Sequence, residues 1–249
     1  MKDTLLRDGV VQISIVIPVW NEEKENIREL YLRLTKVLIS LERTYEIIFV
    51  DDGSKDGTFE VLKSLHRGDK RVKLVRLKKN FGQLAAFLAG LDYAHGKIIV
   101  TMDADLQYAP EDIPKLIKKI DEGFDAVSGK RINKCSPLFT RRIPSYFINL
   151  FISKKVGLRL DYGCSFNAAR REAIERLKGY DRRRFVKPLL AKLVNSFAEL
   201  EVRHYPRKRG GSKYNFFRLV YLGLDTLMNL SLKPSRRDEP LFSIERIIE

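Results

Sequence analysis

The stretch VTMDADLQYAPEDIP, residues 100–114, is an apolar run that ends in closely spaced acidic side chains. Residues i and i+2 of a β-strand point to the same face, so Asp103 and Asp105 can aim at one point, with Gln107 nearby where the chain turns. Two carboxylates that close repel each other unless a positive charge lies between them. A divalent cation such as Mg²⁺ or Mn²⁺ fits this place, and the alternative is a solvated turn with a helix-capping aspartate.

The apolar run is one of several that alternate with helical patterns along the chain. We expect strands at 13–19, 46–54, 72–77, 97–103 and 124–130, and helices at 24–42, 56–67, 81–96 and 111–123. Strands that are apolar throughout and alternate with helices are typical of a parallel sheet with helices on both faces. The sequence therefore predicts an α/β fold with a mostly parallel sheet.

Polar residues follow three of these strands at their carboxyl ends. They occupy Pro18–Glu22, Asp51–Ser54 and Asp103–Gln107. Ligands of open α/β sheets bind beyond the carboxyl ends of the strands, so we expect the three clusters to meet at one edge. In the second cluster, Gly53 and Gly57 favour a tight turn, but the G-x-x-x-x-G-K pattern of a phosphate-binding loop is missing. A carboxylate there is a candidate to bind a base or a ribose.

The overall charge is strongly positive. The 249 residues carry 47 Lys and Arg against 32 Asp and Glu, a formal net charge of +15. This excess favours an anionic partner: a nucleic acid, a lipid headgroup surface or a phosphorylated substrate. Two cysteines are too few for a disulfide scaffold. No stretch has the roughly 18 apolar residues that a membrane span requires, so we expect a chain that is soluble or lies on a membrane.

The pattern changes after residue 132. Residues 203–214 form a basic, glycine-bearing run, and residues 216–234 are apolar but interrupted by charged and polar side chains. We expect a main domain at 1–214 and a C-terminal amphipathic segment at 215–249 that lies at a membrane interface and ends in a charged, peripheral tail. The alternative for the amphipathic helices is that they complete the core or a dimer contact.

Several motifs make the sequence recognisable as a whole. Between residues 14 and 234 they are, in order, SIVIPVWNEE, VDDGSKDGT, NFGQLAAFLAG, MDADLQYAPEDIPKL, SGKR, DYGCSFNAARREAI, RKRGGSKY and SLKP. The set resembles the inverting family 2 glycosyltransferases, and more narrowly the polyprenyl-phosphate sugar transferases. That group includes dolichol-phosphate mannosyltransferase, bactoprenol glucosyltransferases and undecaprenyl-phosphate formamido-arabinose transferases. The resemblance implies the nucleotide-sugar-binding glycosyltransferase A-type (GT-A) fold, with residues 1–214 as the catalytic domain.

The resemblance also implies roles for individual residues. Positions that match those lining or reading the nucleotide base are Pro18, Trp20, Glu22 and Asp52. Positions that match the metal and sugar-diphosphate site are Asp103, Ala104, Asp105 and Gln107, with Asp103, Asp105 and Gln107 as ligands of Mg²⁺ or Mn²⁺. Arg131 matches an arginine that faces phosphate, and Arg207 and Lys213 match a mobile loop that closes over the donor phosphates. The residues implied to be catalytic are Asp103, Asp105, Arg131 and Arg207.

Taken together, the resemblance implies transfer of a sugar from a nucleotide diphosphate sugar, GDP-mannose or a UDP-sugar, to dolichyl or undecaprenyl phosphate. An acceptor phosphate is already anionic, so it needs no general base to become a nucleophile. We expect the enzyme at the cytoplasmic face of a membrane, on an anionic surface. Many relatives continue after SLKP into membrane helices, whereas this chain continues with SRRDEP, so an anchor is absent, truncated or supplied by another protein.

Two other functions fit parts of the sequence. A related transferase acting on a polysaccharide or another small acceptor would keep the site residues, but the Q-x-x-R-W motif of processive synthases is missing. A nucleic-acid-binding module would explain the net charge but not the paired aspartates, so we expect no nucleic acid partner; binding that falls steeply with salt and ignores divalent metal would favour this function. The sequence leaves the sugar, the nucleotide and the oligomeric state open.

Overall fold

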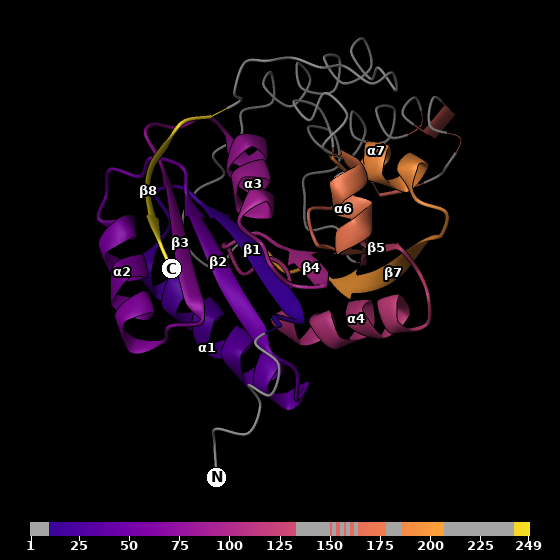
Figure 1. Cartoon of the computed structure of the whole chain (residues 1–249), viewed down its shortest axis with the longest axis horizontal. Helices are drawn as coiled ribbons and strands as arrows, with labels where there is room; N and C mark the ends of the chain where they lie inside the picture. Colours follow the sequence, from indigo (N-terminus) through magenta and orange to yellow (C-terminus); the bar gives the residue numbers. More distant parts are fainter. Residues whose placement is uncertain are drawn as a thin grey trace.

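The computed structural model describes residues 10–132, 150, 153–154, 157, 160–161, 164–177, 186–206 and 242–249 (Figure 1). Within these residues, one sheet has the strand order β7-β5-β6-β4-β1-β2-β3-β8. The strands are β1 (Ile13–Val19), β2 (Tyr45–Asp51), β3 (Val72–Leu77), β4 (Ile98–Thr101), β5 (Ala126–Ile132), β6 (Asn167–Arg170), β7 (Phe197–Arg203) and β8 (Ile244–Ile248). The helices are α1 (Lys24–Ser40), α2 (Thr58–Gly68), α3 (Gln83–Asp92), the short 3₁₀ helix η1 (Pro110–Asp112), α4 (Ile113–Asp121), α6 (Arg171–Leu177) and α7 (Val186–Leu193).

Strand direction places the carboxyl ends of the central strands at one edge of the sheet. β4, β1, β2 and β3 run parallel, and β7 runs parallel to β5, whereas β6 and β8 are antiparallel to their neighbours. Val19 lies opposite Asp51, and Val16 lies opposite Thr101. The polar residues that follow β1, β2 and β4 therefore leave the sheet on the same side, and the predicted α/β fold with a mostly parallel sheet is confirmed.

Two hydrophobic cores lie on opposite faces of the sheet. Because side chains alternate along a strand, Ile15 of β1 packs in one core and Val16 in the other. Helices α1, α2 and α4 contribute to the first core, and α3, α6 and α7 contribute to the second (Figure 1). Buried residues recur in α1 at spacings of three and four: Ile27, Leu30, Leu34 and Leu38. The prediction that helices cover both faces is confirmed.

The C-terminal residues form an edge strand of the sheet, which the expectation of a charged, peripheral tail did not include. Residues 244–248 form β8, which pairs antiparallel with β3 and becomes an edge strand of the sheet. Ile244 and Ile248 are partly buried, Ile244 against the second core and Ile248 against the first, and the three residues between them are exposed. The sheet therefore uses residues from both sides of the domain boundary predicted at 214.

The remainder of the predicted amphipathic segment, residues 215–241, lies outside the described residues, so its place at a membrane interface stays a prediction. In the part of the chain that the structure describes, no helix is long and apolar enough to cross a membrane.

Candidate active site

Hydrogen bonds join the first two polar clusters directly. The amide of Asn21 donates to Ser54 Oγ (2.9 Å), and the amide of Lys55 donates to Asn21 Oδ1 (2.9 Å). Asn21 has a φ of 44°, in the left-handed region that a short polar side chain tolerates better than most. The turn after β1 and the turn after β2 are thus one connected structure, as the shared sheet edge predicts.

Asp52 connects this structure to the segment that enters α3. Its carboxylate is buried and accepts hydrogen bonds from the amides of Phe81 (2.7 Å) and Gly82 (2.9 Å). Burial raises the pKa of Asp52, the two amide bonds lower it, and the neighbouring Asp51 raises it again, with a net increase. Both oxygens hold the backbone at 81–82, and a contact with a nucleotide base stays a prediction.

We expect Asp52→Asn to lower the free energy of unfolding by about 1–3 kcal/mol, because an amide has one acceptor oxygen where two backbone N–H groups need acceptors. Thermal unfolding of the variant and of the wild type measures the difference. Asp56→Asn is the matched control: the Asp56 carboxylate accepts from the Thr58 amide (3.1 Å), and asparagine keeps an oxygen that can accept the same bond. Equal losses of stability in the two variants would contradict the role assigned to Asp52.

The third cluster is linked to the same segment through Asp103. Its Oδ1 accepts a hydrogen bond from Gln83 Nε2 (2.5 Å), and its Oδ2 accepts one from Ser165 Oγ (2.6 Å). Gln83 is the first residue of α3, and Ser165 lies just before β6. These donors are neutral groups, so the bonds orient the carboxylate without offsetting its charge. The predicted meeting of the three clusters at one edge is confirmed by this chain of contacts.

The loop that carries the acidic pair has a strained backbone. Leu106 has a φ of 60°, an uncommon conformation for a bulky residue, and its side chain is buried in the first core. Asp105 is also buried, and its Oδ1 accepts a hydrogen bond from the Gln107 amide (3.1 Å), closing a turn around Leu106. Strain of this kind persists where the surroundings over-determine it and clusters at functional sites. Burial of Leu106 therefore fixes the loop between Asp105 and Gln107, two of the three predicted metal ligands.

Gln107 ties this loop to the end of β7. Its Nε2 donates to the carbonyl of Tyr205 (3.2 Å), and its own carbonyl accepts from the Tyr205 amide (2.8 Å). Tyr108 forms an isolated bridge with His204 next to this pair. The backbone that leads toward residue 207 is thus anchored on the acidic loop. Arg207 and Lys213 themselves lie outside the described residues, so their predicted contacts with phosphate stay predictions.

The residues predicted to line the base differ in exposure. Trp20 is 38% exposed at the sheet edge, as a stacking platform requires, and Pro18 is half-buried. Glu22 is buried, and its Oε1 accepts from Asn26 Nδ2 (2.9 Å) and from the Glu23 amide (3.2 Å), so it also stabilises the start of α1. Ala104 is buried between the two aspartates of the third cluster. Contacts of these residues with a donor stay predictions.

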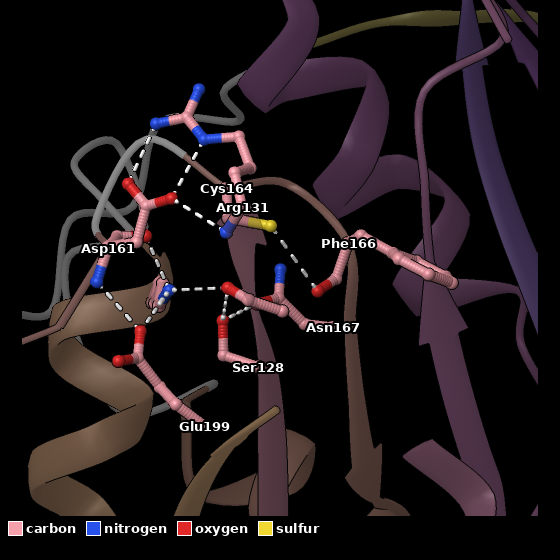
Figure 2. Close-up of polar contacts among 9 residues, drawn as sticks. Ser128, Arg131, Asp161, Cys164, Phe166, Asn167 and Glu199 are labelled. Atoms are coloured by element: carbon pink, nitrogen blue, oxygen red, sulfur yellow. Dashed lines mark hydrogen bonds and ion pairs between the residues drawn. The ribbon is translucent and has the colours of Figure 1, made fainter. Parts of the chain in front are cut away.

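Arg131 lies at the end of β5 in a close ion pair with Asp161 (Figure 2). Its Nε donates to Asp161 Oδ2 (2.8 Å) and its Nη2 to Oδ1 (2.7 Å), a bidentate geometry. Burial alone would lower the pKa of Arg131, but Asp161 raises it well above its ordinary range. A contact of Arg131 with substrate phosphate stays a prediction. The sequence reasoning missed Asp161 as a partner, although it lies in the quoted motif DYGC.

Metal ligands of the protein are few at this edge. In the described ranges, no group of three or more His, Cys, Asp or Glu side chains is placed to hold a metal ion. The acidic loop offers the carboxylates of Asp103 and Asp105 and the side-chain amide of Gln107. Such a set fits an ion that takes its other ligands from substrate phosphates and water, as Mg²⁺ does.

A mostly parallel α/β sheet with an acidic loop at its carboxyl edge is an arrangement that GT-A-like transferases have. The sequence profile of Glycosyl transferase family 2 matches residues 14–178. The chain belongs to this family and is a glycosyltransferase.

Curated relatives are similar over most of the chain. An undecaprenyl-phosphate 4-deoxy-4-formamido-L-arabinose transferase from Salmonella choleraesuis (strain SC-B67) is 41% identical over 231 residues, which cover 91% of this chain and 70% of the relative. The enzyme of the same name from Salmonella paratyphi B has the same identity and coverage. The predicted resemblance to the polyprenyl-phosphate sugar transferases is confirmed.

Solved structures share the fold. Glucosyl-3-phosphoglycerate synthase from Mycobacterium tuberculosis, solved with Mn²⁺, UDP and phosphoglyceric acid, superimposes with a TM-score of 0.66 at 18% identity, over 89% of this chain and 78% of the other. A mannosyltransferase from Pyrobaculum calidifontis, solved with GDP-mannose and Mn²⁺, gives 0.59 at 20% identity, over 81% and 59%. At these identities the likeness establishes the fold alone, and it confirms the GT-A-type architecture.

Proposed function

We propose that this glycosyltransferase moves a sugar from a nucleotide diphosphate sugar to undecaprenyl phosphate, with inversion at the anomeric carbon. The observation that carries the proposal is the 41% identity over 91% of the chain to transferases named for that lipid acceptor. The acidic loop at the sheet edge supports a phosphorylated donor, because its carboxylates can hold a divalent cation that binds a diphosphate. Dolichyl phosphate and GDP-mannose, which the sequence left open, become the less favoured acceptor and donor.

The proposed chemistry is mainly a matter of charge. Asp103 and Asp105 would hold Mg²⁺ or Mn²⁺, with Gln107 as a further ligand. Such an ion, when bound, offsets the negative charge that develops on the departing nucleotide diphosphate. Solved structures of this fold that contain Mn²⁺ support the choice of a divalent cation. Arg131 would add positive charge at the same edge and reach a phosphate oxygen through Nη1, because its Nε and Nη2 are bound to Asp161.

The acceptor side follows from the chemistry of a lipid phosphate. The phosphate monoester is already an anion, so the protein has to hold two negatively charged reactants together rather than remove a proton. Arg207 and Lys213 are proposed to add positive charge over the donor phosphates and so to offset the repulsion between the two reactants. The net charge of +15 supports attraction to an anionic membrane surface, where such an acceptor lies. We propose peripheral action at the cytoplasmic face, with residues 215–241 or an anchoring protein providing contact.

A thermal-shift panel with UDP-, GDP- and dTDP-sugars, with and without Mn²⁺, tests the donor. A ligand that binds only the folded state raises its stability, by about 2.7 kcal/mol at a concentration of one hundred times Kd. We expect UDP-sugars to raise the melting temperature, and to do so only when Mn²⁺ is present. A metal-independent shift, or none with any nucleotide sugar, would count against the proposal.

A transfer assay with undecaprenyl phosphate in detergent tests the acceptor. Mass spectrometry of the lipid fraction should detect an undecaprenyl phosphate carrying one sugar, with release of the nucleoside diphosphate. Transfer to soluble oligosaccharides but not to the lipid would replace the proposed acceptor with a glycan.

A further inference from the structure

Four charged residues form a cluster near the acidic loop. Of these four, the proposed chemistry uses only Arg131. They are Arg131 of β5, Asp161, Lys187 of α7 and Glu199 of β7, here called the α7 charge cluster. Figure 2 labels Arg131, Asp161 and Glu199. The Lys187 side chain is only 6% exposed. Burial lowers its pKa, and the carboxylates of Glu199 and Asp161 act in the opposite direction. Burial of an ammonium group costs free energy unless it has close polar partners, so the partners of Lys187 indicate what the side chain does.

Lys187 and Glu199 together grip the backbone of Asp161. Lys187 Nζ donates to the Asp161 carbonyl (2.5 Å), and the Asp161 amide donates to Glu199 Oε1 (2.7 Å). The two side chains also form an ion pair with each other, 3.2 Å between Nζ and Oε1. Asp161 is therefore fixed at both its N–H and its C=O, by residues from two elements that follow it in the chain.

The side chain of Asp161 transmits this grip to Arg131. Its carboxylate binds Nε and Nη2 of the guanidinium and also accepts from the Arg131 amide (3.2 Å). A bidentate pair fixes the plane of the guanidinium as well as its distance. Nη1 takes no part in this pair. The contacts thus run from Lys187 and Glu199 through Asp161 to Arg131 and set the direction of its remaining donors.

Ring and backbone contacts connect the strand of Arg131 to the acidic loop. The ring of Tyr108, which follows Gln107, packs against the ring of Phe166 with centroids 5.6 Å apart. The strands give the same picture, since the amide of Gly129 in β5 donates to the carbonyl of Phe166 (2.8 Å), next to the Ser165 that binds Asp103.

We propose that Asp161, Lys187 and Glu199 are positioning residues that hold the Arg131 guanidinium in one orientation for a phosphate oxygen of the substrates. The inference rests on the proposed function for the substrate and on the contacts above for the positioning. A buried ion pair is weak evidence for stability, because desolvation of two charges offsets most of their attraction. Its effect in this place is to exclude other orientations of Asp161, and with it of Arg131.

Two variants separate positioning from stability. Lys187→Met leaves Glu199 without its cation, so the melting temperature should fall. Lys187→Met combined with Glu199→Gln removes both charges, and replacing a buried pair as a whole is often neutral for stability. We expect the double variant to regain the melting temperature of the wild type but to keep a kcat/KM reduced at least about tenfold, because small misplacements of a catalytic group are costly.

Asp161→Asn and Arg131→Lys complete the set. Asp161→Asn should show the same loss of kcat/KM as the double variant, and Arg131→Lys should lose at least as much, since lysine keeps the charge but not the fork. Recovery of turnover together with stability in the double variant would show a structural role and overturn the proposal.

A measurement without substrate keeps the test independent of the proposed function. The Nε–Hε NMR resonance of Arg131, assigned by its disappearance in Arg131→Lys, reports the pair with Asp161 directly. We expect its exchange with solvent to be at least about tenfold slower in the wild type than in the double variant, because the bidentate bond protects the hydrogen. Equal exchange rates would overturn the positioning role, whereas absence of sugar transfer by the wild type would overturn the proposed function alone.

Discussion

Replacing Asp105 by asparagine is expected to reduce sugar transfer by at least about a hundredfold while the protein stays folded, since the loss of one preorganised group at a developing charge has this order of effect. The Asp105 side chain is buried, and asparagine keeps an oxygen that accepts from the Gln107 amide. The loop can therefore keep its shape while position 105 loses its negative charge and Asp103 keeps its own. Turnover at saturating donor, together with the Mn²⁺-dependent thermal shift by a UDP-sugar, measures the effect.

Asp121→Asn is the matched control for this variant. Asp121 ends α4 and pairs with Arg43 at the surface, 2.7 Å between Nη2 and Oδ2, so the same chemical change occurs away from the sheet edge. Surface pairs of this kind contribute about 0–1 kcal/mol, and turnover should be unchanged. Asp105→Asn with the turnover of the control would contradict the assignment of Asp105 to the donor site.

Gly53→Ala should cost about 2–6 kcal/mol of stability, because backbone strain and overpacking each cost about 1–3 kcal/mol and both apply here. Gly53 has a φ of +68°, and a Cβ at this position would lie 2.5 Å from the carbonyl carbon of Lys79 and 2.9 Å from the amide nitrogen of Asn80. These are backbone atoms, which cannot rotate away. Their displacement would move the segment that continues to Gln83 and Asp103. Thermal unfolding and donor-induced shifts measure both consequences.

Gly57→Ala is the control for Gly53→Ala. Gly57 also has a positive φ, +83°, but a Cβ there would meet only the end of the Lys24 side chain, at 3.7 Å. This variant carries the strain without the collision and should cost about 1 kcal/mol. Equal costs for the two variants would show that the contact between the second polar cluster and residues 79–80 is not tight.

The architecture was predictable because its signals are local. Continuous apolar strands, helical periodicity and polar residues after the strands lead to a mostly parallel sheet and to the edge where the clusters meet. The antiparallel strand β6 and the edge strands β7 and β8 were not predicted. Ile244 and Ile248 are separated by charged and exposed residues, and only the edge of β3 shows where the two isoleucines become partly buried.

The acidic residues of the candidate site could be predicted from the sequence, but the residues that hydrogen-bond to them could not. Asp103 and Asp105 stand out because paired carboxylates after a strand need an explanation. Gln83 and Ser165, which bind Asp103, lie 20 and 62 residues away, and no local pattern connects them. Lys187 was also missed, since a lysine in an amphipathic helix is normally exposed, and its burial follows from tertiary packing against Glu199 and Asp161.

Diffraction at the manganese absorption edge from crystals grown with UDP and Mn²⁺ tests the central claim most directly. The account predicts one anomalous peak beside the carboxylates of Asp103 and Asp105, in contact with the diphosphate of UDP, at roughly the 2 Å distances of metal–oxygen bonds. UDP bound at the sheet edge with no anomalous peak near these aspartates, or a peak elsewhere on the protein, would contradict it.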